Sequence, residues 1–197
     1  MLRYEKRARK KGYKVIAGID EAGRGPLAGP VVACAVIIKD LDFSSRIDDS
    51  KKLSPARRLA AYKEIIEKAH IGISMVDEDI IDSVNIRRAT IMAMEEAVIN
   101  LGVEPDILLI DGDLKLDLPY RQEQIIKGDS KSVSIAAASI IAKVARDALM
   151  IDFHKIYPQY RFDLHKGYGT RRHIEAIARH GLSPIHRRSF RIHSKSS

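Results

Sequence analysis

The most constraining feature of this chain is Val31–Ile38, a run of mostly β-branched residues without a single polar side chain. A run of this length and composition predicts a strand that is buried on both faces. Such a strand needs apolar partners above and below its sheet, and helices are the elements that cover the two faces of a mixed sheet. The chain is therefore expected to adopt an α/β fold around one central sheet.

The segments on either side of this run supply the remaining elements. Further strands are predicted at Lys14–Ile19, Ile71–Val76, Asp106–Asp111 and, more briefly, around Gln124–Ile126. Helices are predicted from Pro55, which follows an N-capping Ser54, to about Lys68, from Ile86 to Leu101, and from Val133 to about His154. The remainder, from Tyr157 to Ser197, is expected to form shorter helices and loops.

The 197 residues contain no internal repeat, no low-complexity tract and no linker rich in glycine, serine or proline. We therefore expect a single domain over 1–197, with a basic arm up to about residue 13 and a helical, substrate-binding C-terminal part from about residue 157 to 197. No apolar stretch reaches the length of about 18 residues that a membrane span requires. The single cysteine, Cys34, excludes an internal disulfide and favours a reducing, cytoplasmic setting.

The formal net charge of +8 is concentrated at the two ends of the chain. Glu5 is the only acid among the first 14 residues, and Asp163 and Glu175 are the only acids from residue 155 onward, where lysine and arginine are frequent. Basic ends around a near-neutral middle favour a polyanionic partner, because neutralising phosphates releases counterions. Charge alone leaves open a basic surface that serves only solubility.

Acidic residues stand where the predicted strands end. Asp20 and Glu21 close the first strand, Asp111 closes the strand Asp106–Asp111, and Asp129 precedes the alanine-rich helix. Neighbouring strands are only about 4.7–4.9 Å apart, and two like charges 4 Å apart repel by about 4 kcal/mol at an effective dielectric of 20. A hard divalent cation offsets that repulsion, and all-oxygen ligation favours Mg²⁺ or Mn²⁺. The pattern predicts a metal site suited to phosphodiester hydrolysis.

Each of these acids, taken alone, has a plainer interpretation. A carboxylate at a strand end is often a solvated loop residue, and Asp129 has the position of an N-cap for the helix that follows. Asp113 and Asp117, in the same part of the chain, are interpreted as such bystanders. The metal-site interpretation gains weight from the glycine-rich segment that directly follows the first acidic pair.

That segment, Gly23–Gly29, does not have the context of a dinucleotide-binding loop. Such a loop needs a helix after the glycines, so that the helix N-terminus meets the pyrophosphate. Here the strand Val31–Ile38 follows instead, and Asp20 and Glu21 would repel phosphate. We interpret the segment as a tight backbone platform that a substrate approaches closely, with Arg24 available for a phosphate.

Several blocks of the sequence resemble the ribonuclease HII family. The resemblance rests on Gly18–Pro30 (GIDEAGRGPLAGP), Asp49–Leu53 (DSKKL), Ile110–Gly112 (IDG), Lys127–Ser132 (KGDSKS), Ile135–Asp147 (IAAASIIAKVARD), His165–Thr170 (HKGYGT) and His186–Phe190 (HRRSF). These blocks occur in order over nearly the whole chain. The resemblance implies a ribonuclease H-like fold, with a central five-stranded mixed sheet flanked by helices and a small helical C-terminal part.

The resemblance also implies roles for individual residues. Asp20, Glu21, Asp111 and Asp129 match the family's four-carboxylate site for two divalent ions, Mg²⁺ or Mn²⁺. Gly23, Arg24 and Gly25 match the motif whose backbone contacts the ribonucleotide 2′-hydroxyl, the group that distinguishes RNA from DNA. Tyr168 matches the tyrosine that packs on the sugar at the RNA–DNA junction, and Lys51 resembles a phosphate-contacting lysine.

The implied reaction is hydrolysis of the RNA strand of RNA–DNA hybrids and nicking on the 5′ side of single ribonucleotides in duplex DNA, leaving 3′-hydroxyl and 5′-phosphate ends. The related ribonuclease HIII family carries an extra N-terminal substrate-binding domain, for which the roughly 13 residues before the first predicted strand leave no room. Two other classes stay open: a basic nucleic-acid-binding module without catalysis, and a nuclease of this fold that ignores the 2′-hydroxyl. A monomer is expected, and protein partners are left open.

The histidines show no metal-ligand spacing with cysteine. His173 and His180 are a heptad apart on a predicted helix, which is typical of a solvated face. His165 is close to Tyr168 in sequence, and this makes it a further candidate for a substrate contact.

Overall fold

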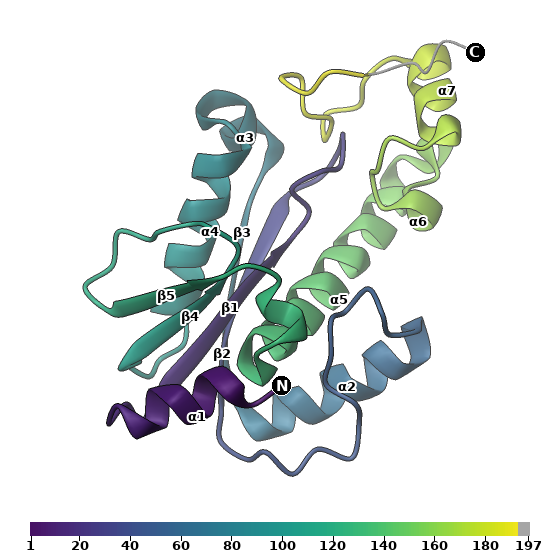
Figure 1. Ribbon diagram of the computed structural model, residues 1–197. Coiled ribbons are helices and arrows are strands. Elements are labelled where there is room, and N and C mark those ends of the chain that lie inside the picture. Colours follow the sequence, from purple (N-terminus) through teal and green to yellow (C-terminus); the bar gives the residue numbers. More distant parts are fainter. Residues whose placement is uncertain (193–197) are drawn as a thin grey trace.

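The computed structural model describes residues 1–192 and is built around one five-stranded sheet with the strand order β3-β2-β1-β4-β5 (Figure 1). The strands are β1 (Ile16–Ala22), β2 (Val31–Ile38), β3 (Ala69–Val76), β4 (Ile107–Asp111) and β5 (Arg121–Ile125). β2 pairs antiparallel with β1 and β3, whereas β1 with β4 and β4 with β5 are parallel pairs. The sheet is mixed, as the sequence predicts. Residues 193–197, which include His193 and Lys195 of the basic C-terminal end, lie outside the described part.

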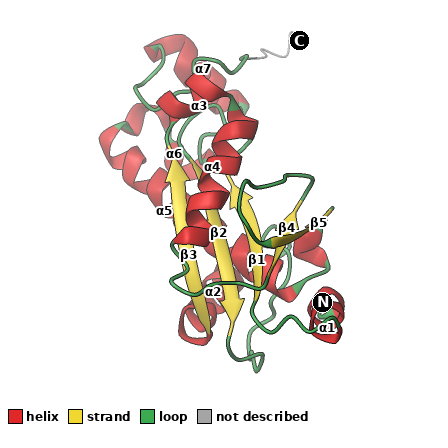
Figure 2. Ribbon diagram, turned by 90° about the vertical axis from the view of Figure 1, so that its left-hand side faces the viewer, coloured by secondary structure: helices red, strands yellow, loops and turns green. Residues whose placement is uncertain are grey.

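Helices cover both faces of this sheet (Figure 2). They are α1 (Arg3–Lys10), α2 (Pro55–Lys68), α3 (Glu78–Val84), α4 (Ile86–Ile99), α5 (Val133–Ile156), α6 (Phe162–His165) and α7 (Arg171–His180), with 3₁₀ turns at Gly128–Ser130 and Pro158–Tyr160. α4 packs on β2 and β3 from one side, and α5 packs on β1 and β2 from the other. None of the helices within residues 1–192 has both the length and the apolar character needed to cross a membrane.

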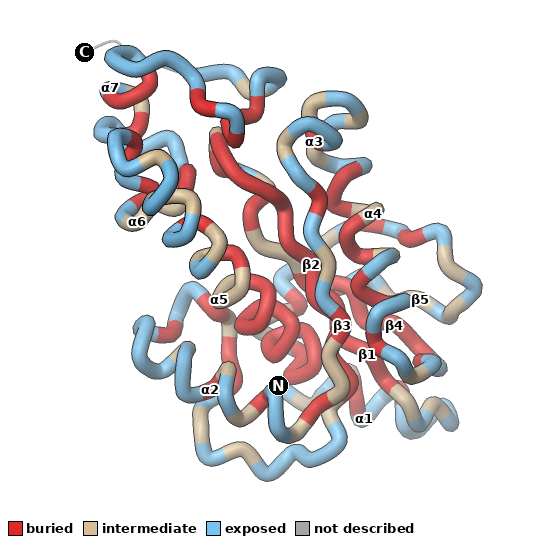
Figure 3. Tube along the Cα trace, turned by 180° about the vertical axis from the view of Figure 1, so that it is seen from behind, coloured by how far each residue is buried: buried red, intermediate tan, exposed pale blue. Residues whose placement is uncertain are grey.

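The strand β2 is buried on both faces, as its sequence predicts. Val31, Ala33, Ala35 and Ile37 belong to the apolar cluster that contains α4, whereas Cys34 and Val36 belong to the cluster that contains α2 and α5. The residues of β1, β2 and the first half of α5 are accordingly almost all buried (Figure 3). Complete burial of each larger aliphatic side chain contributes roughly 1.5–3 kcal/mol, so these three elements form the rigid centre of the molecule.

Several predicted boundaries are confirmed and others move. α2 begins at Pro55, and the Ser54 hydroxyl accepts a hydrogen bond from the Arg57 amide at 3.4 Å, as expected of an N-cap. β1 continues to Ala22 because that residue pairs with Val32, so the first acidic pair lies inside the strand rather than after it. β3 and β5 begin earlier than predicted, since pairing with β2 and β4 extends strands whose first residues carry little apolar signal.

The basic N-terminal arm forms a helix that the sequence analysis does not predict. α1 buries only Glu5 and Ala8, so its apolar periodicity is too weak to indicate a helix. Its anchor is polar: Glu5 Oε1 accepts a hydrogen bond from the Ser132 hydroxyl at 2.5 Å and from the Ser134 amide at 3.1 Å. Since Ser132 is the N-cap of α5, the arm is fastened to the start of that helix.

The C-terminal part packs its own small cluster against α5 and the glycine-rich segment. This cluster combines Ala28 and Met150 with Tyr160, Phe162, Ala176, Ile177 and Ile185. The prediction that His173 lies on a solvated helix face is wrong: its side chain is fully buried, whereas His180 is exposed. The face of α7 that carries His173 is turned inward because aromatic and histidine rings, rather than aliphatic residues, fill the space beneath it.

Candidate active site

The register of the sheet brings two of the predicted acids level with each other. β1 and β4 run parallel with Ile19 paired to Ile110, so Asp20 and Asp111 are the next residues on neighbouring strands. Alternation puts both on the α5 side of the sheet, because Ile16 on β1 and Ile107 and Leu109 on β4 belong to the cluster that contains Ile135 of α5. The two carboxylates therefore face the same helix from adjacent strands.

Asp20 is a buried carboxylate with only 5% of its surface exposed. Burial raises its pKa well above the usual value, and the neighbouring charges of Glu21 and Asp111 raise it further. Two hydrogen bonds to Asp20 lower its pKa and offset part of this increase. One comes from the Ser139 hydroxyl on α5, and the other from the Glu21 amide, which donates to Asp20 Oδ1 at 2.7 Å. Without a bound cation, the charged form of Asp20 is therefore unfavourable in the folded protein.

Glu21 and Asp129 have the same electrostatic problem. Burial raises the pKa of Glu21, opposed by Arg24, whose Nη1 lies 3.2 Å from Glu21 Oε1. The other oxygen, Glu21 Oε2, is buried and has no hydrogen-bond partner among residues 1–192. Burial also raises the pKa of Asp129, and the charges of Asp49 and Asp111 add to this effect. Three of the four acids are therefore held where a cation would relieve them.

Asp129 is held at the site by the turn that contains it. Asp111 Oδ1 accepts a hydrogen bond from the Gly128 amide at 2.6 Å, which ties the 3₁₀ turn to the end of β4. The N-cap of α5 is Ser132, whose hydroxyl accepts from the Ile135 amide. The plainer interpretation of Asp129 as the N-cap is therefore wrong.

The donor set suits a hard divalent cation. It consists of carboxylate oxygens with one buried and unpartnered oxygen on Glu21, and it contains no sulfur or imidazole. Within residues 1–192, no three His, Cys, Asp or Glu side chains already stand close enough together to hold an ion. Like charges repel by about 4 kcal/mol at 4 Å and an effective dielectric of 20, so a cation between these carboxylates would favour their closer approach in the charged form.

The glycine-rich segment forms the wall next to the acids. Gly23 and Gly29 have φ angles of +100° and +83°, which residues with a side chain rarely adopt. Arg24 forms an ion pair with Glu21, and its side chain stays 40% exposed. Gly25 is exposed, and a Cβ atom built on it would lie 3.8 Å from Cε1 of Tyr168, so the tyrosine ring stands opposite this glycine.

All nine predicted site residues line one cavity of about 460 Å³. They are Asp20, Glu21, Gly23, Arg24, Gly25, Lys51, Asp111, Asp129 and Tyr168. Ser50, Ser139 and Lys143 line the same cavity and were assigned no role from the sequence. A signal for two of them exists: Ser139 and Lys143 are the polar residues of the stretch 135–144 and are four apart on the helix, which places them on one face.

Residues interpreted as bystanders lie outside this cavity. Asp113 forms an exposed ion pair with Arg87 at 3.1 Å, and Asp117 is exposed. His165 does not line the cavity either; it is buried, and its Nε2 is 2.8 Å from the Tyr160 carbonyl oxygen. The expectation that His165 contacts substrate is therefore not supported by its position.

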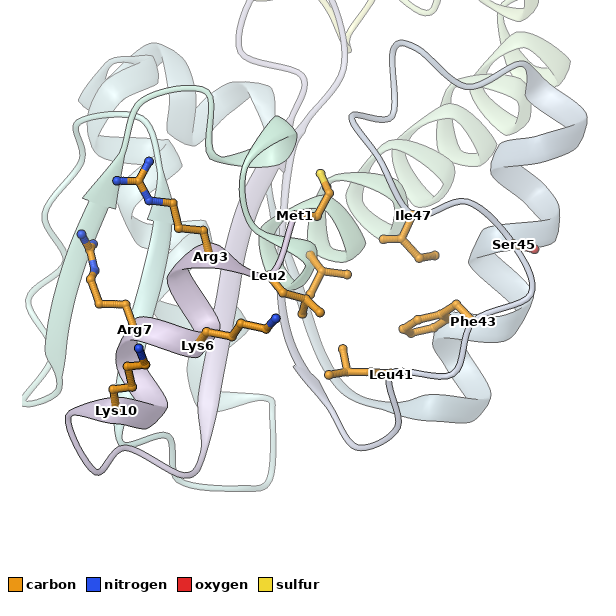
Figure 4. A pocket seen from close by; sticks show the side chains of 11 residues that line it. Met1, Leu2, Arg3, Lys6, Arg7, Lys10, Leu41, Phe43, Ser45 and Ile47 are labelled. Atoms are coloured by element: carbon orange, nitrogen blue, oxygen red, sulfur yellow. The ribbon is translucent and has the colours of Figure 1, made fainter.

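A larger hollow of about 880 Å³ lies elsewhere, between α1 and the segment 41–47 (Figure 4). Arg3, Lys6, Arg7 and Lys10 of α1 form one side, and Leu41, Phe43 and Ile47 form the other. No acidic side chain lines it. It therefore lacks the ligands for a divalent cation, and the smaller cavity with the four carboxylates is the candidate active site.

Comparisons of the sequence with known proteins point to one family. A family model described as ribonuclease HII matches residues 17–193. The chain is 55% identical over 191 residues to ribonuclease HII of Bacillus pumilus, covering 96% of this chain and 75% of that protein. It is 54% identical over 192 residues to ribonuclease HII of Syntrophus aciditrophicus, covering 97% and 91%. Its structure matches a chain in the PCNA:RNase HII complex from Archaeoglobus fulgidus with a TM-score of 0.78, 27% identity and coverage of 93% and 98%.

Proposed function

The chain belongs to the ribonuclease HII family, and on that premise we propose that it nicks duplex DNA on the 5′ side of single embedded ribonucleotides and hydrolyses the RNA strand of RNA–DNA hybrids. Membership establishes an endoribonuclease of the ribonuclease H type. The proposal adds the substrate position, the product ends, a 3′-hydroxyl and a 5′-phosphate, and the residues that perform the reaction.

One observation carries this proposal: the carboxylates and the residues expected to recognise ribose line the same cavity. Asp20, Glu21, Asp111 and Asp129 would hold Mg²⁺ or Mn²⁺, two ions in the full complex. When bound, such ions supply Lewis-acid stabilisation of the phosphate and lower the pKa of the attacking water. The role of the chain is to hold the four carboxylates in place and to keep Asp20 and Glu21 buried against α5 and the glycine-rich segment.

The recognition half of the cavity consists of neutral and basic groups. The amides of Arg24 and Gly25 donate to no acceptor within residues 1–192, so they are available to a 2′-hydroxyl. The ring of Tyr168 stands opposite Gly25, where it would pack on the sugar that follows. Lys51 lines the cavity, and its positive charge opposes the raised pKa values of Glu21 and Asp129, so it would contact a neighbouring phosphate.

The test of the proposed function is cleavage of matched duplexes. A DNA duplex with one ribonucleotide should be cut once, 5′ to that nucleotide, in Mg²⁺ or Mn²⁺, and should stay intact in EDTA. An all-DNA duplex of the same sequence should stay intact in both. Equal cutting of both duplexes would favour a nuclease that ignores the 2′-hydroxyl, and salt-dependent binding without cutting would favour a non-catalytic nucleic-acid-binding module.

Metal binding should also be visible in thermal stability. A ligand that binds only the folded chain stabilises it by about 2.7 kcal/mol at 100 times its Kd. For a chain of this length, that corresponds to an increase in Tm of roughly 5–10 °C. We expect Mn²⁺ to raise the Tm of the wild-type chain and of Asp113→Asn, whose acid lies outside the cavity, but not of Asp111→Asn. A Tm that does not change with Mn²⁺ in the wild-type chain would contradict the carboxylate assignment.

A further inference from the structure

A short loop after α7, residues 183–187, is buried to a degree unusual for a loop. Ser183, Ile185, His186 and Arg187 are each at most 5% exposed. The loop pairs with the glycine-rich segment through its backbone: the Gly29 amide donates to the Ile185 carbonyl at 2.8 Å, and the Arg187 amide donates to the Leu27 carbonyl at 2.9 Å. A distant part of the sequence is thus joined to the segment that borders the acids.

The side chain of Arg187 binds the same segment through every one of its donors. Nε donates to the Gly29 carbonyl, Nη1 to the carbonyls of Arg24 at 3.0 Å and Pro26 at 2.9 Å, and Nη2 to the carbonyls of Gly23 and Gly29, both at 2.6 Å. Within residues 1–192, no carboxylate lies within ion-pair distance of this guanidinium, and burial is the main reason that its pKa is lowered to about 9. The guanidinium group of Arg187 therefore donates five hydrogen bonds to backbone carbonyls and forms no ion pair with a described carboxylate.

This arrangement determines which way the peptide groups of the segment face. In a trans peptide, the carbonyl of one residue and the amide of the next point in opposite directions. The carbonyls of Gly23 and Arg24 point to Arg187, so the amides of Arg24 and Gly25 point away from it. Neither of these two amides has an acceptor within residues 1–192, and both residues line the cavity.

His186, next to Arg187, acts on Tyr168 through a second histidine. The Ser183 amide donates to His186 Nδ1 at 2.9 Å, so the proton of His186 is on Nε2, which donates to His173 Nε2 at 3.0 Å. The proton of His173 is then on Nδ1, which donates to the Tyr168 carbonyl at 3.0 Å. Burial lowers the pKa of both histidines to about 4, so both rings stay neutral near pH 7 and this order of protons is kept.

We propose that residues 183–187 are a positioning element for ribose recognition: Arg187 turns the Arg24 and Gly25 amides toward the substrate, and the relay from Ser183 through His186 and His173 fixes the backbone of Tyr168. The inference rests on the proposed function, because it assumes that these amides and this tyrosine read the ribose. In this arrangement, residues 183–187 position the groups that contact the ribose.

The test compares two substrates, a duplex with one ribonucleotide and a long RNA–DNA hybrid. A single ribonucleotide offers one 2′-hydroxyl, whereas a hybrid offers one at each position, so misplaced amides should harm the first substrate more. For Arg187→Lys, which keeps the charge but not the five donors, we expect kcat/KM on the first substrate, relative to the hybrid, to fall roughly tenfold to hundredfold. His186→Phe, which removes both ring nitrogens, should lower the same ratio. His186→Gln should restore part of it, because its amide can both accept from Ser183 and donate to His173.

Ile177→Ala is the matched control, since it weakens the same C-terminal cluster while Arg187 and the side chains of the relay are kept. It should lower the Tm and leave the substrate ratio unchanged. If Arg187→Lys does not fold, the ratio of kcat/KM on the two substrates for the two His186 variants tests the inference. An unchanged ratio in the folded variants, with a wild-type chain that nicks at ribonucleotides, would overturn this inference alone. A wild-type chain that does not nick at them would overturn the proposed function and the inference together.

Discussion

Replacing Asp20 with asparagine is expected to abolish cleavage while making the metal-free protein more stable at pH 7. Asparagine has nearly the same shape and keeps an oxygen for the hydrogen bond from the Glu21 amide. It removes one charge from a cluster that would bind the divalent ions. Loss of a single group that stabilises a transition state typically costs a factor of about 10²–10³, and for a metal-holding carboxylate we expect a loss of roughly 10³-fold or more in kcat. Single-turnover cutting of a singly substituted duplex measures it.

The stability gain follows from the direction of the pKa shift. Asp20 has a folded-state pKa well above its unfolded value of about 3.8, so the folded chain holds this proton more tightly. Stability then decreases as the pH rises from about 4 through the raised pKa, and the full cost of the buried charge is present above it. Asp20→Asn removes that cost. In EDTA, denaturant unfolding should show a gain at pH 7 that shrinks toward pH 4.

Asp113→Asn is the control for both measurements, because Asp113 is exposed and lies outside the cavity. It should cut at the wild-type rate and change the free energy of unfolding little. Wild-type cutting by Asp20→Asn would contradict the assignment of this carboxylate. A lower stability of Asp20→Asn at pH 7 would contradict the electrostatic account of its burial.

Gly18→Ala is expected to destabilise the chain strongly, because the added methyl group has no room between β1 and α5. A Cβ atom on Gly18 would lie 2.1 Å from the Ser134 backbone carbon and 2.4 Å from the Ile135 amide nitrogen. Both atoms belong to the first turn of α5, which cannot retreat without separating from β1. Overpacking of a core typically costs about 1–3 kcal/mol, and we expect at least the upper end here because the clash is with backbone.

The clash should also affect catalysis, since Gly18 lies two residues before Asp20 on the same face of β1. Moving α5 outward would carry Ser139 away from Asp20. We expect soluble Gly18→Ala protein to have a Tm lowered by about 6 °C or more, at roughly 2–4 °C for each kcal/mol, and reduced cutting. Gly102→Ala is the comparison: its φ is +65°, but nothing lies within 4 Å of the added atom. A Gly18→Ala variant as stable as Gly102→Ala would show that α5 does not pack as closely as described.

The candidate site was predictable from the sequence to the extent that local patterns carry it. β2 and α2 have the residue ranges that their apolar run and N-cap predict. Asp20, Glu21 and Asp111 are indicated by their place at strand ends and Asp129 by its place before the alanine-rich helix. The sheet register then places Asp20 level with Asp111. Their roles stay predictions until the variants are measured. The roles in ribose recognition come only from the family resemblance, because an exposed tyrosine and a glycine-rich turn do not by themselves indicate a ligand.

The residues that the sequence analysis missed act over long distances along the chain. Arg187 lies 164 residues from Gly23, to which it donates a hydrogen bond, and Glu5 lies 127 residues from Ser132. In sequence, Arg187 is one more basic residue near a basic end, and His173 is a polar residue on a short helix. Neither position has a periodicity that separates a buried, fully paired side chain from a solvated one.

The sequence by itself determined the α/β class, the doubly buried strand and the set of acids, because runs of apolar residues along the chain indicate buried strands and the positions where they end. Only the tertiary structure decided which carboxylate oxygens lack partners, how the glycine-rich segment is oriented and which ring nitrogens carry protons. The physical reason is that hydrogen bonds and desolvation depend on the groups that surround an atom in space. For Asp20, Arg187 and His173 those groups come from β4, α5, the glycine-rich segment and residues 183–187, which meet only in the folded chain.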